Sequence, residues 1–271
     1  MSYIDELFSV TGKTALVTGA ATGIGRMAAT ALVMGGARVF IASRKGAACE
    51  AAASEINALG GTGRAEGFEG DVGSEEGVAA LAAELGRRTD SLHILINNAG
   101  LSWGAELANF PYKAWARVLD VNVTGLFHLT RELLPLLDKA ASHGDPARII
   151  NLGSVMGTQP MADGAYSYTA SKAAVHHLTK TLANELAGRR ITVNAFAPGP
   201  FQSKMTEFAT GTDEQAEMVA KRVPMGRLGS LDDIAGATLY LCGRAGSYVT
   251  GAILPIDGGQ SVQHGMRLFK E

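Results

Sequence analysis

Two residues that could share a proton lie four positions apart in the chain. Tyr168 and Lys172 belong to the segment Tyr-Thr-Ala-Ser-Lys, and in a helix both side chains would lie on one face, one turn apart. A free tyrosine has a pKa of about 10 and transfers protons poorly at neutral pH. A neighbouring cation favours the phenolate and lowers that pKa. The pair is therefore a candidate general acid–base, although many helices carry the same spacing on a solvated face.

A glycine-rich turn near the N-terminus could hold a phosphate group. Residues 18–25 read Thr-Gly-Ala-Ala-Thr-Gly-Ile-Gly and lie between an expected strand and an expected helix. Glycines let the backbone approach a pyrophosphate, and the start of a helix offers free N–H groups and the positive end of its dipole. The candidate cofactor contacts in this turn are Gly19, Thr22, Gly23, Ile24 and Gly25.

The end of the second expected strand bears on which dinucleotide would bind. An acidic residue about 20 positions after the glycines would favour NAD, because it accepts hydrogen bonds from the ribose 2′-hydroxyl. Here the strand runs into Ser43 and Arg44 instead. A guanidinium suits a 2′-phosphate. The sequence favours NADP(H), with NAD(H) as the alternative, since Arg44 could also belong to a solvated basic loop.

The elements that would position these residues alternate regularly along the chain. Short apolar strands are expected at 14–18, 38–42, 63–68, 94–97, 148–152, 191–196 and 252–255. Helices are expected at 24–34, 47–59, 74–87, 113–139, 166–187 and 231–242. Strands without polar alternation are typical of a sheet covered on both faces. The pattern predicts one α/β domain over residues 1–271, with a Rossmann-type, doubly wound parallel sheet of about seven strands and helices on both faces.

The composition argues against several classes of protein. With 24 Lys and Arg against 26 Asp and Glu, the net charge is −2, so neither nucleic acid nor an anionic membrane is an expected partner. Two cysteines are too few for a disulfide framework and favour a reducing compartment. The N-terminus is acidic where a signal peptide is basic, and no apolar run approaches the ~18 residues of a membrane span. We expect a cytoplasmic globular protein without a metal site.

The motifs, taken in order, resemble those of the short-chain dehydrogenase/reductase family. Residues 18–25 are similar to its TGxxxGxG turn, 97–100 to its NNAG segment, and 168–172 to its YxxxK pair. Asn122 is similar to the family's helix asparagine, Ser154 to its catalytic serine, and the stretch from Pro198 to its PGxxx(S/T)xM pattern. The likeness covers nearly the whole chain and is nearest to 3-oxoacyl-thioester reductases, including the rhamnolipid-synthesis type.

This resemblance implies a mechanism and a set of roles. Tyr168 would donate a proton to a carbonyl oxygen as hydride arrives from the nicotinamide, and Ser154 would stabilise charge on that oxygen. Lys172 would lower the pKa of Tyr168 and bind the nicotinamide ribose, while Asn122 would hold a water that relays protons. The implied activity is NADPH-dependent reduction of a ketone such as a 3-oxoacyl thioester. The alternatives are an NAD-dependent secondary-alcohol dehydrogenase and a non-catalytic cofactor-binding sensor.

Further contacts and an assembly follow from the same resemblance. The additional implied cofactor contacts are Asp71, Val72, Asn98, Ala99, Gly100, Pro198, Gly199 and Ser203, beside Tyr168 and Lys172. The substrate, a small carbonyl compound or alcohol, would meet Trp103, Met156, Tyr166, Pro200 and Phe201. From its polar composition, the segment 206–223 is expected to be a mobile lid that lines the substrate pocket, with one short helix within 213–222, or else an ordinary surface insertion. The spacing of Ser154 and Tyr168 is one residue longer than is commonest, which predicts a bulged loop. A homotetramer is implied, with a homodimer as the alternative.

Overall fold

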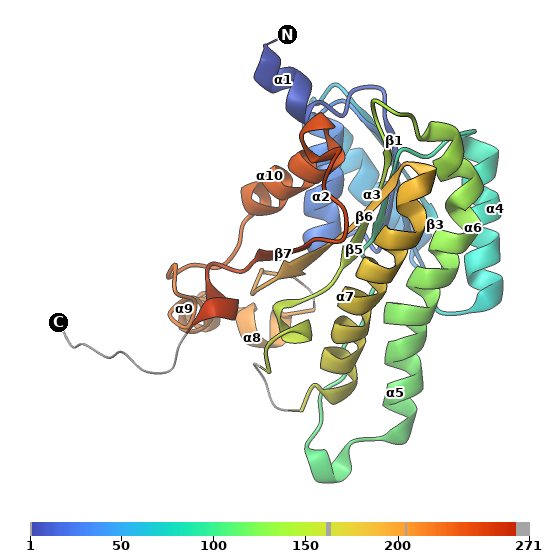
Figure 1. Cartoon of the computed structure of the whole chain (residues 1–271). Helices are drawn as coiled ribbons and strands as arrows, with labels where there is room; N and C mark the ends of the chain where they lie inside the picture. Colours follow the sequence, from blue (N-terminus) through green and yellow to red (C-terminus); the bar gives the residue numbers. More distant parts are fainter. Residues whose placement is uncertain (1, 161–163, 204, 264–271) are drawn as a thin grey trace.

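The computed structural model describes residues 2–160, 164–203 and 205–263 (Figure 1). In this part of the chain, seven strands form one sheet in the order β3-β2-β1-β4-β5-β6-β7, and all neighbouring strands are parallel. The strands are β1 (Thr14–Thr18), β2 (Arg38–Ser43), β3 (Arg64–Glu69), β4 (Ile94–Asn97), β5 (Ala147–Leu152), β6 (Ile191–Pro198) and β7 (Ile253–Ile256). The predicted doubly wound parallel sheet is confirmed.

Most helices begin and end close to the expected residues. They are α1 (Tyr3–Phe8), α2 (Gly23–Met34), α3 (Gly46–Asn57), α4 (Glu75–Arg88), α5 (Tyr112–Leu119), α6 (Gly125–Ala140), α7 (Tyr166–Leu186), α8 (Glu207–Thr210), α9 (Asp213–Ala220) and α10 (Leu231–Cys242). The long helix expected at 113–139 is divided, because a π-helical turn, η2 (Asp120–Thr124), separates α5 from α6. The short helix α1 has no counterpart among the expected helices, and a capping box between Ser2 and Asp5 starts it.

Apolar side chains on alternate strand positions fill two layers of core. In β1, Ala15 and Val17 belong to one layer and Leu16 belongs to the other, because successive side chains of a strand point to opposite faces. The first layer packs against α2, α3 and α10, and the second against α4, α6 and α7 (Figure 1). Both faces of the sheet are therefore covered, which explains why the strands read as continuous apolar runs.

The direction in which strands are added to the sheet reverses between β1 and β4. From β1 the chain builds outward through β2 and β3, and from β4 it builds the other way through β5, β6 and β7. At such a reversal the connections diverge and leave a crevice beyond the carboxyl ends of the two strands. The glycine turn after β1 and the Asn-Asn-Ala-Gly segment after β4 meet at this crevice.

The segment expected to act as a lid contains two short helices rather than one. Helix α8 covers Glu207–Thr210, and α9 covers Asp213–Ala220. A capping box formed by Thr212 and Gln215 starts α9. The Thr206 hydroxyl donates a hydrogen bond of 2.7 Å to the carbonyl of Phe201, which fastens the beginning of the segment to the end of the sheet.

Two further observations describe the chain as a whole. Among the helices of the described ranges, none is long and apolar enough to cross a bilayer. Cys49 and Cys242 are both free and buried, so neither contributes a disulfide.

Candidate active site

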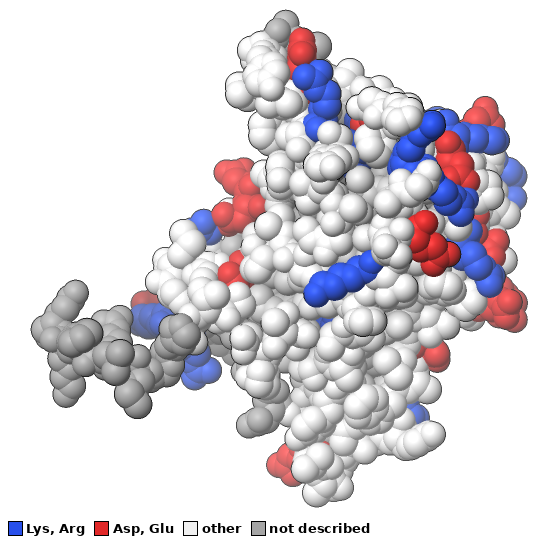
Figure 2. Space-filling model, viewed as in Figure 1, with Lys and Arg blue, Asp and Glu red and all other residues white. Residues whose placement is uncertain are grey.

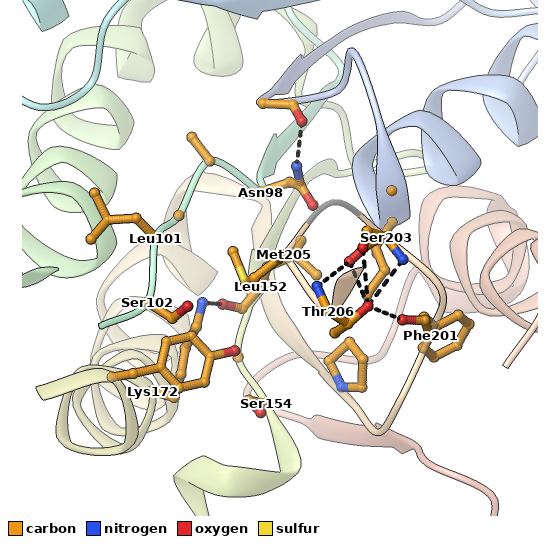
Figure 3. Close-up of a pocket in the computed structure, with 18 of the residues that line it drawn as sticks. Asn98, Leu101, Ser102, Leu152, Ser154, Lys172, Phe201, Ser203, Met205 and Thr206 are labelled. Atoms are coloured by element: carbon orange, nitrogen blue, oxygen red, sulfur yellow. Dashed lines mark hydrogen bonds between the residues drawn. The ribbon is translucent and has the colours of Figure 1, made fainter. Parts of the chain in front are cut away.

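A cavity of about 470 Å³ opens beyond the carboxyl ends of β1 and β4 (Figure 3). Its walls come from the turns after the central strands, the first turns of α7 and the segment after β6. The predicted site residues that line it are Gly19, Thr22, Gly23, Ile24, Asn98, Ala99, Gly100, Ser154, Tyr168, Lys172, Pro198, Gly199, Phe201 and Ser203. The structure thus brings most of the predicted catalytic and cofactor residues around one space.

The turn between β1 and α2 forms a cradle that side chains would fill. Gly19 and Gly23 have φ angles of 66° and 61°, in the left-handed region that favours glycine. A Cβ at Gly19 would lie 2.9 Å from the Cα of Ala99, and one at Gly23 would lie 3.1 Å from the Cβ of Ser203. Helix α2 begins at Gly23, so its free N–H groups are next to this cradle. The turn therefore fits the diphosphate of a dinucleotide.

Asn98 ties the glycine turn to the segment after β4. Its Nδ2 donates hydrogen bonds to the carbonyls of Thr18 at 2.8 Å and Gly19 at 3.1 Å. Gly25, which does not line the cavity, lies directly against this amide, since a Cβ there would be 2.2 Å from Asn98 Nδ2. The structure shows close packing of α2 on Asn98 at Gly25, and the expected contact of Gly25 with the cofactor stays a prediction.

Tyr168, Lys172 and Ser154 come together at one side of the cavity. Tyr168 and Lys172 lie one turn apart at the start of α7, and the Lys172 Nζ is 5.5 Å from the centre of the Tyr168 ring. The lysine is only 5% exposed, and its Nζ donates a 2.5 Å hydrogen bond to the carbonyl of Leu152. Ser154 follows β5, is buried, and accepts a hydrogen bond from the Met156 N–H at 3.2 Å.

The pKa of Tyr168 is shifted in the opposite direction from the one expected from its neighbour Lys172. Burial raises the pKa of Tyr168, and a hydrogen bond with the Ser154 side chain opposes the rise without cancelling it. Burial also lowers the pKa of Lys172 to about 8. The expected lowering of the Tyr168 pKa by the lysine is wrong for this geometry, because the ammonium bonds to the Leu152 carbonyl and faces the ring. At neutral pH the phenol therefore keeps its proton, which suits a donor.

Asn122 occupies the π-helical turn, but its side chain is already engaged. Its Nδ2 donates to the Leu101 carbonyl at 3.0 Å and to the Ser171 hydroxyl at 2.9 Å, and its Oδ1 accepts from the Leu101 N–H at 2.9 Å. Both side-chain N–H groups are engaged, so a water could be held only by an oxygen of Asn122, and the relay role stays a prediction. These hydrogen bonds fix the backbone of Leu101, a residue of the cavity wall, to Ser171 of α7 through the Asn122 side chain.

Arg44 and Asp71 lie in a neighbouring cavity of about 340 Å³ rather than in the main one. The two cavities share Leu101, so an elongated ligand could extend from one into the other. Val72 lines a third hollow, which shares Gly73 and Asp120 with this neighbouring cavity. Ser43 lines none of these spaces. Its hydroxyl accepts a hydrogen bond from the Lys45 N–H at 3.3 Å and contacts the Cys49 sulfur at 3.0 Å.

Of the predicted substrate residues, only Phe201 lines the main cavity. Tyr166 packs instead against Phe110, with ring centres 5.3 Å apart. Pro200 lines a separate small pocket. Trp103 is 37% exposed outside the cavity. Met156 is also absent from the wall, since its turn folds back on Ser154. The expected bulge before Tyr168 falls partly on residues 161–163, outside the described residues.

Several residues of the wall were missed by sequence reasoning. They are Leu101, Ser102, Leu152 and Gly153. Each lies next to a recognised motif, so adjacency was the available signal. Met205, from the pattern that begins at Pro198, and Thr206, the first residue of the expected lid, also line the wall. Thr206 also changes the environment of Ser203, because the two hydroxyls lie 3.1 Å apart and the Ser203 N–H donates to the Thr206 hydroxyl at 3.0 Å (Figure 3).

A doubly wound sheet, a glycine cradle at its switch point and a Tyr–Lys pair beside it define an NAD(P)-dependent oxidoreductase. Residues 19–261 match the family model described as enoyl-(acyl carrier protein) reductase. The chain belongs to the short-chain dehydrogenase/reductase family.

Two curated relatives and one solved structure show the range of similarity. The rhamnolipids biosynthesis 3-oxoacyl-[acyl-carrier-protein] reductase of Pseudomonas aeruginosa is 45% identical, over 93% of this chain and 97% of the relative. The 2-dehydro-3-deoxy-D-gluconate 5-dehydrogenase of Bacillus subtilis is 40% identical, over 96% and 98%. The Pseudomonas aeruginosa RhlG/NADP active-site complex superimposes with a TM-score of 0.90 at 44% identity, covering 94% of this chain and 99% of that one.

Proposed function

We propose that this protein is an NADPH-dependent carbonyl reductase that reduces a ketone to a secondary alcohol, with 3-oxoacyl thioesters as its substrate class. The observation that carries the proposal is a buried phenol in the same cavity as the glycine cradle. Tyr168 points into that space with Ser154 beside it and Lys172 behind its ring. Reduction of a ketone consumes a proton, and a phenol placed beside a hydroxyl that can bind the carbonyl oxygen can supply it, so the site suits the reductive direction.

The chain's own residues account for the proton and the charge. Bound NADPH would supply the hydride that adds to the carbonyl carbon. Tyr168 donates its proton to the carbonyl oxygen, and the Ser154 hydroxyl donates a hydrogen bond that stabilises the negative charge developing there. Lys172 keeps a positive charge next to the phenolate that Tyr168 becomes, until a proton from solvent restores the phenol. The products are the alcohol and NADP⁺, so one hydride and one proton are consumed for each ketone.

We assign the dinucleotide to the two connected cavities. The diphosphate would meet the cradle of Gly19 and Gly23, and the adenosine half would extend past Leu101 to Arg44 and Asp71. The relatives support NADP as the cofactor, since the solved structure with a TM-score of 0.90 is an NADP complex. Arg44 offers the charge that a 2′-phosphate requires.

The substrate class is supported by both the wall and the relatives. Leu101, Leu152, Phe201 and Met205 give the main cavity a largely apolar lining beside the hydroxyls of Ser154 and Tyr168. Such a lining suits an acyl chain better than a polyol. The relative at 45% identity is a 3-oxoacyl-[acyl-carrier-protein] reductase. A sugar-acid dehydrogenase is the second candidate, because a relative at 40% identity acts on 2-dehydro-3-deoxy-D-gluconate.

A steady-state assay tests the substrate class. We expect NADPH to be oxidised fastest with 3-oxoacyl-coenzyme A thioesters of increasing chain length, and slowly or not at all with a keto-gluconate. A 2-enoyl thioester, in which a C=C bond would be reduced instead, should give no turnover. Faster turnover of the keto-gluconate would replace the thioester proposal with the second candidate, and the absence of turnover with every ketone would reject a reductase.

The cofactor preference rests on Arg44, so Arg44→Leu is expected to raise KM for NADPH by about 10-fold or more, the cost of one charge-assisted contact. KM for NADH, which lacks the 2′-phosphate, should change little. Arg64→Leu is a matched control, because Arg64 is also exposed but lies at the amino end of β3, whereas Arg44 follows the carboxyl end of the neighbouring strand β2. Equal effects of Arg44→Leu on both cofactors would show that the guanidinium does not meet the 2′-phosphate.

We further propose that the chain is a single domain that assembles as a homotetramer in the cytoplasm, with residues 206–223 as a lid. Two buried free cysteines are compatible with a reducing compartment. Around α5 the surface exposes Leu107, Tyr112 and Trp115, and Figure 2 shows few charges on the lower part of this face. Light scattering on the purified protein distinguishes a tetramer from a dimer or a monomer.

A further inference from the structure

One buried histidine extends the row formed by Tyr168 and Lys172 along α7. His176 lies one turn after Lys172, so the three side chains occupy positions i, i+4 and i+8 on one helix face. All three reach the stretch of chain where β5 ends and the following turn begins. Tyr168 is hydrogen-bonded to the Ser154 side chain, Lys172 bonds to the Leu152 carbonyl, and His176 lies under the backbone of Ser154.

The imidazole of His176 contacts the turn through both of its nitrogens. The backbone N–H of Ser154 donates to Nε2 at 3.4 Å, and Nδ1 lies 3.3 Å from the Thr158 hydroxyl. A neutral imidazole has one N–H and one acceptor nitrogen. Because Nε2 accepts from Ser154, Nδ1 must carry the proton and donate to Thr158. One neutral ring therefore holds both ends of the turn between these residues.

Two glycines make room for this ring. A Cβ at Gly153 would lie 2.2 Å from His176 Nε2, and a Cβ at Gly157 would lie 2.8 Å from His176 Cε1. The ring is 7% exposed. Without side chains at either position, the turn closes tightly over the imidazole, and a shift of the ring would move the backbone of Ser154.

We propose that His176 is a positioning residue for carbonyl reduction, which it serves by fixing the backbone of Ser154 so that the serine hydroxyl stays beside Tyr168. The proposal rests on the reductase function given above. His176 does not line the cavity and does not touch the reacting atoms. It acts through Ser154, and a displacement of about 1 Å at such a group can cost about 100-fold in rate.

The surroundings keep the ring in the neutral form that this role requires. Burial, with a smaller contribution from the positive charges of Lys172 and Lys180 on the same helix, lowers the pKa of His176 to about 4. Protonation would place an N–H at Nε2, where it would oppose the Ser154 N–H. Near neutral pH the acceptor therefore persists.

Variants of His176 separate positioning from packing. His176→Met fills a similar volume with only a weak sulfur acceptor, whereas His176→Gln can place its Oε1 close to the position of Nε2. We expect His176→Met to lower kcat by about 10- to 100-fold with KM for NADPH within about twofold of wild type. We expect His176→Gln to restore most of the loss. His177→Met is the matched control, since His177 is exposed on the next position of α7.

Two results would overturn the proposal. The first applies once the wild type has been shown to reduce ketones. Equal kcat for the folded His176→Met and His176→Gln variants would then show that the ring only fills space. The second measurement needs no turnover: nitrogen NMR of the wild-type imidazole should show a neutral ring with its proton on Nδ1. A proton on Nε2 would exclude the bond from Ser154, even if the methionine variant did not fold or the wild type reduced no ketone.

Discussion

Tyr168→Phe is expected to lower kcat/KM for ketone reduction by about 10²- to 10⁴-fold, the range that a positioned general acid contributes. The substitution removes one oxygen and keeps the ring, so the contact with Lys172 and the packing of α7 persist. NADPH binding, measured by fluorescence titration, should remain within a few-fold of wild type. The loss should therefore fall mainly on kcat.

The matched control for this variant is Tyr166→Phe. Tyr166 lies two residues earlier on α7 and packs its ring against Phe110, a contact that phenylalanine preserves. Its activity should equal that of wild type. Full activity of the Tyr168→Phe protein in a sensitive assay would show that another group donates the proton.

Lys172→Met is expected to reduce activity by about 100-fold or more while leaving the apoprotein as stable as wild type near pH 7, or more so. The side chain is 5% exposed, and burial lowers its pKa from 10.5 to about 8, so the folded protein carries an ammonium that it has partly desolvated. Methionine removes that cost but leaves the Leu152 carbonyl without its donor, a loss of about 1 kcal/mol.

The buried lysine also makes the free energy of unfolding of the wild type depend on pH. Between pH 8 and 10.5 the unfolded chain still holds the lysine proton that the folded chain has released, so wild-type stability rises with pH in this window. Relative to Lys172→Met, the gain should approach about 3 kcal/mol. Urea unfolding at several pH values measures it. Lys180→Met, on an exposed position of the same helix, is the control. Parallel stability curves for wild type and Lys172→Met would mean that the ammonium is solvated.

The pair of Tyr168 and Lys172 could be located from sequence because helix periodicity alone places them together. The direction of the shift in the Tyr168 pKa could not be predicted, since it depends on burial and on the orientation of the Lys172 ammonium. That orientation is set by the Leu152 carbonyl, which lies 20 residues before Lys172 in the chain. Local spacing carries no information about such a contact.

The glycine turn and the cavity wall show the same contrast between features that local sequence determines and features that depend on contacts distant in the chain. Gly19 and Gly23 need their conformations for a junction between adjacent elements, so their motif is readable locally. Tyr166 was expected in the pocket, but its ring partner Phe110 is supplied by a loop between β4 and α5. The π-helical turn around Asn122 has no signature in hydrophobic periodicity, so the contacts of this side chain with Leu101 and Ser171 could not be predicted.

The row of Tyr168, Lys172 and His176 has a consequence for how such an enzyme can diversify. The acid, its cation and the imidazole beneath the serine all belong to α7, a helix of 21 residues anchored in the core. Phe201 and Met205, which complete the cavity, belong to a separate segment after β6. That segment is interchangeable in principle: exchanging it for its counterpart from another relative would present a different substrate to unaltered proton-transfer machinery.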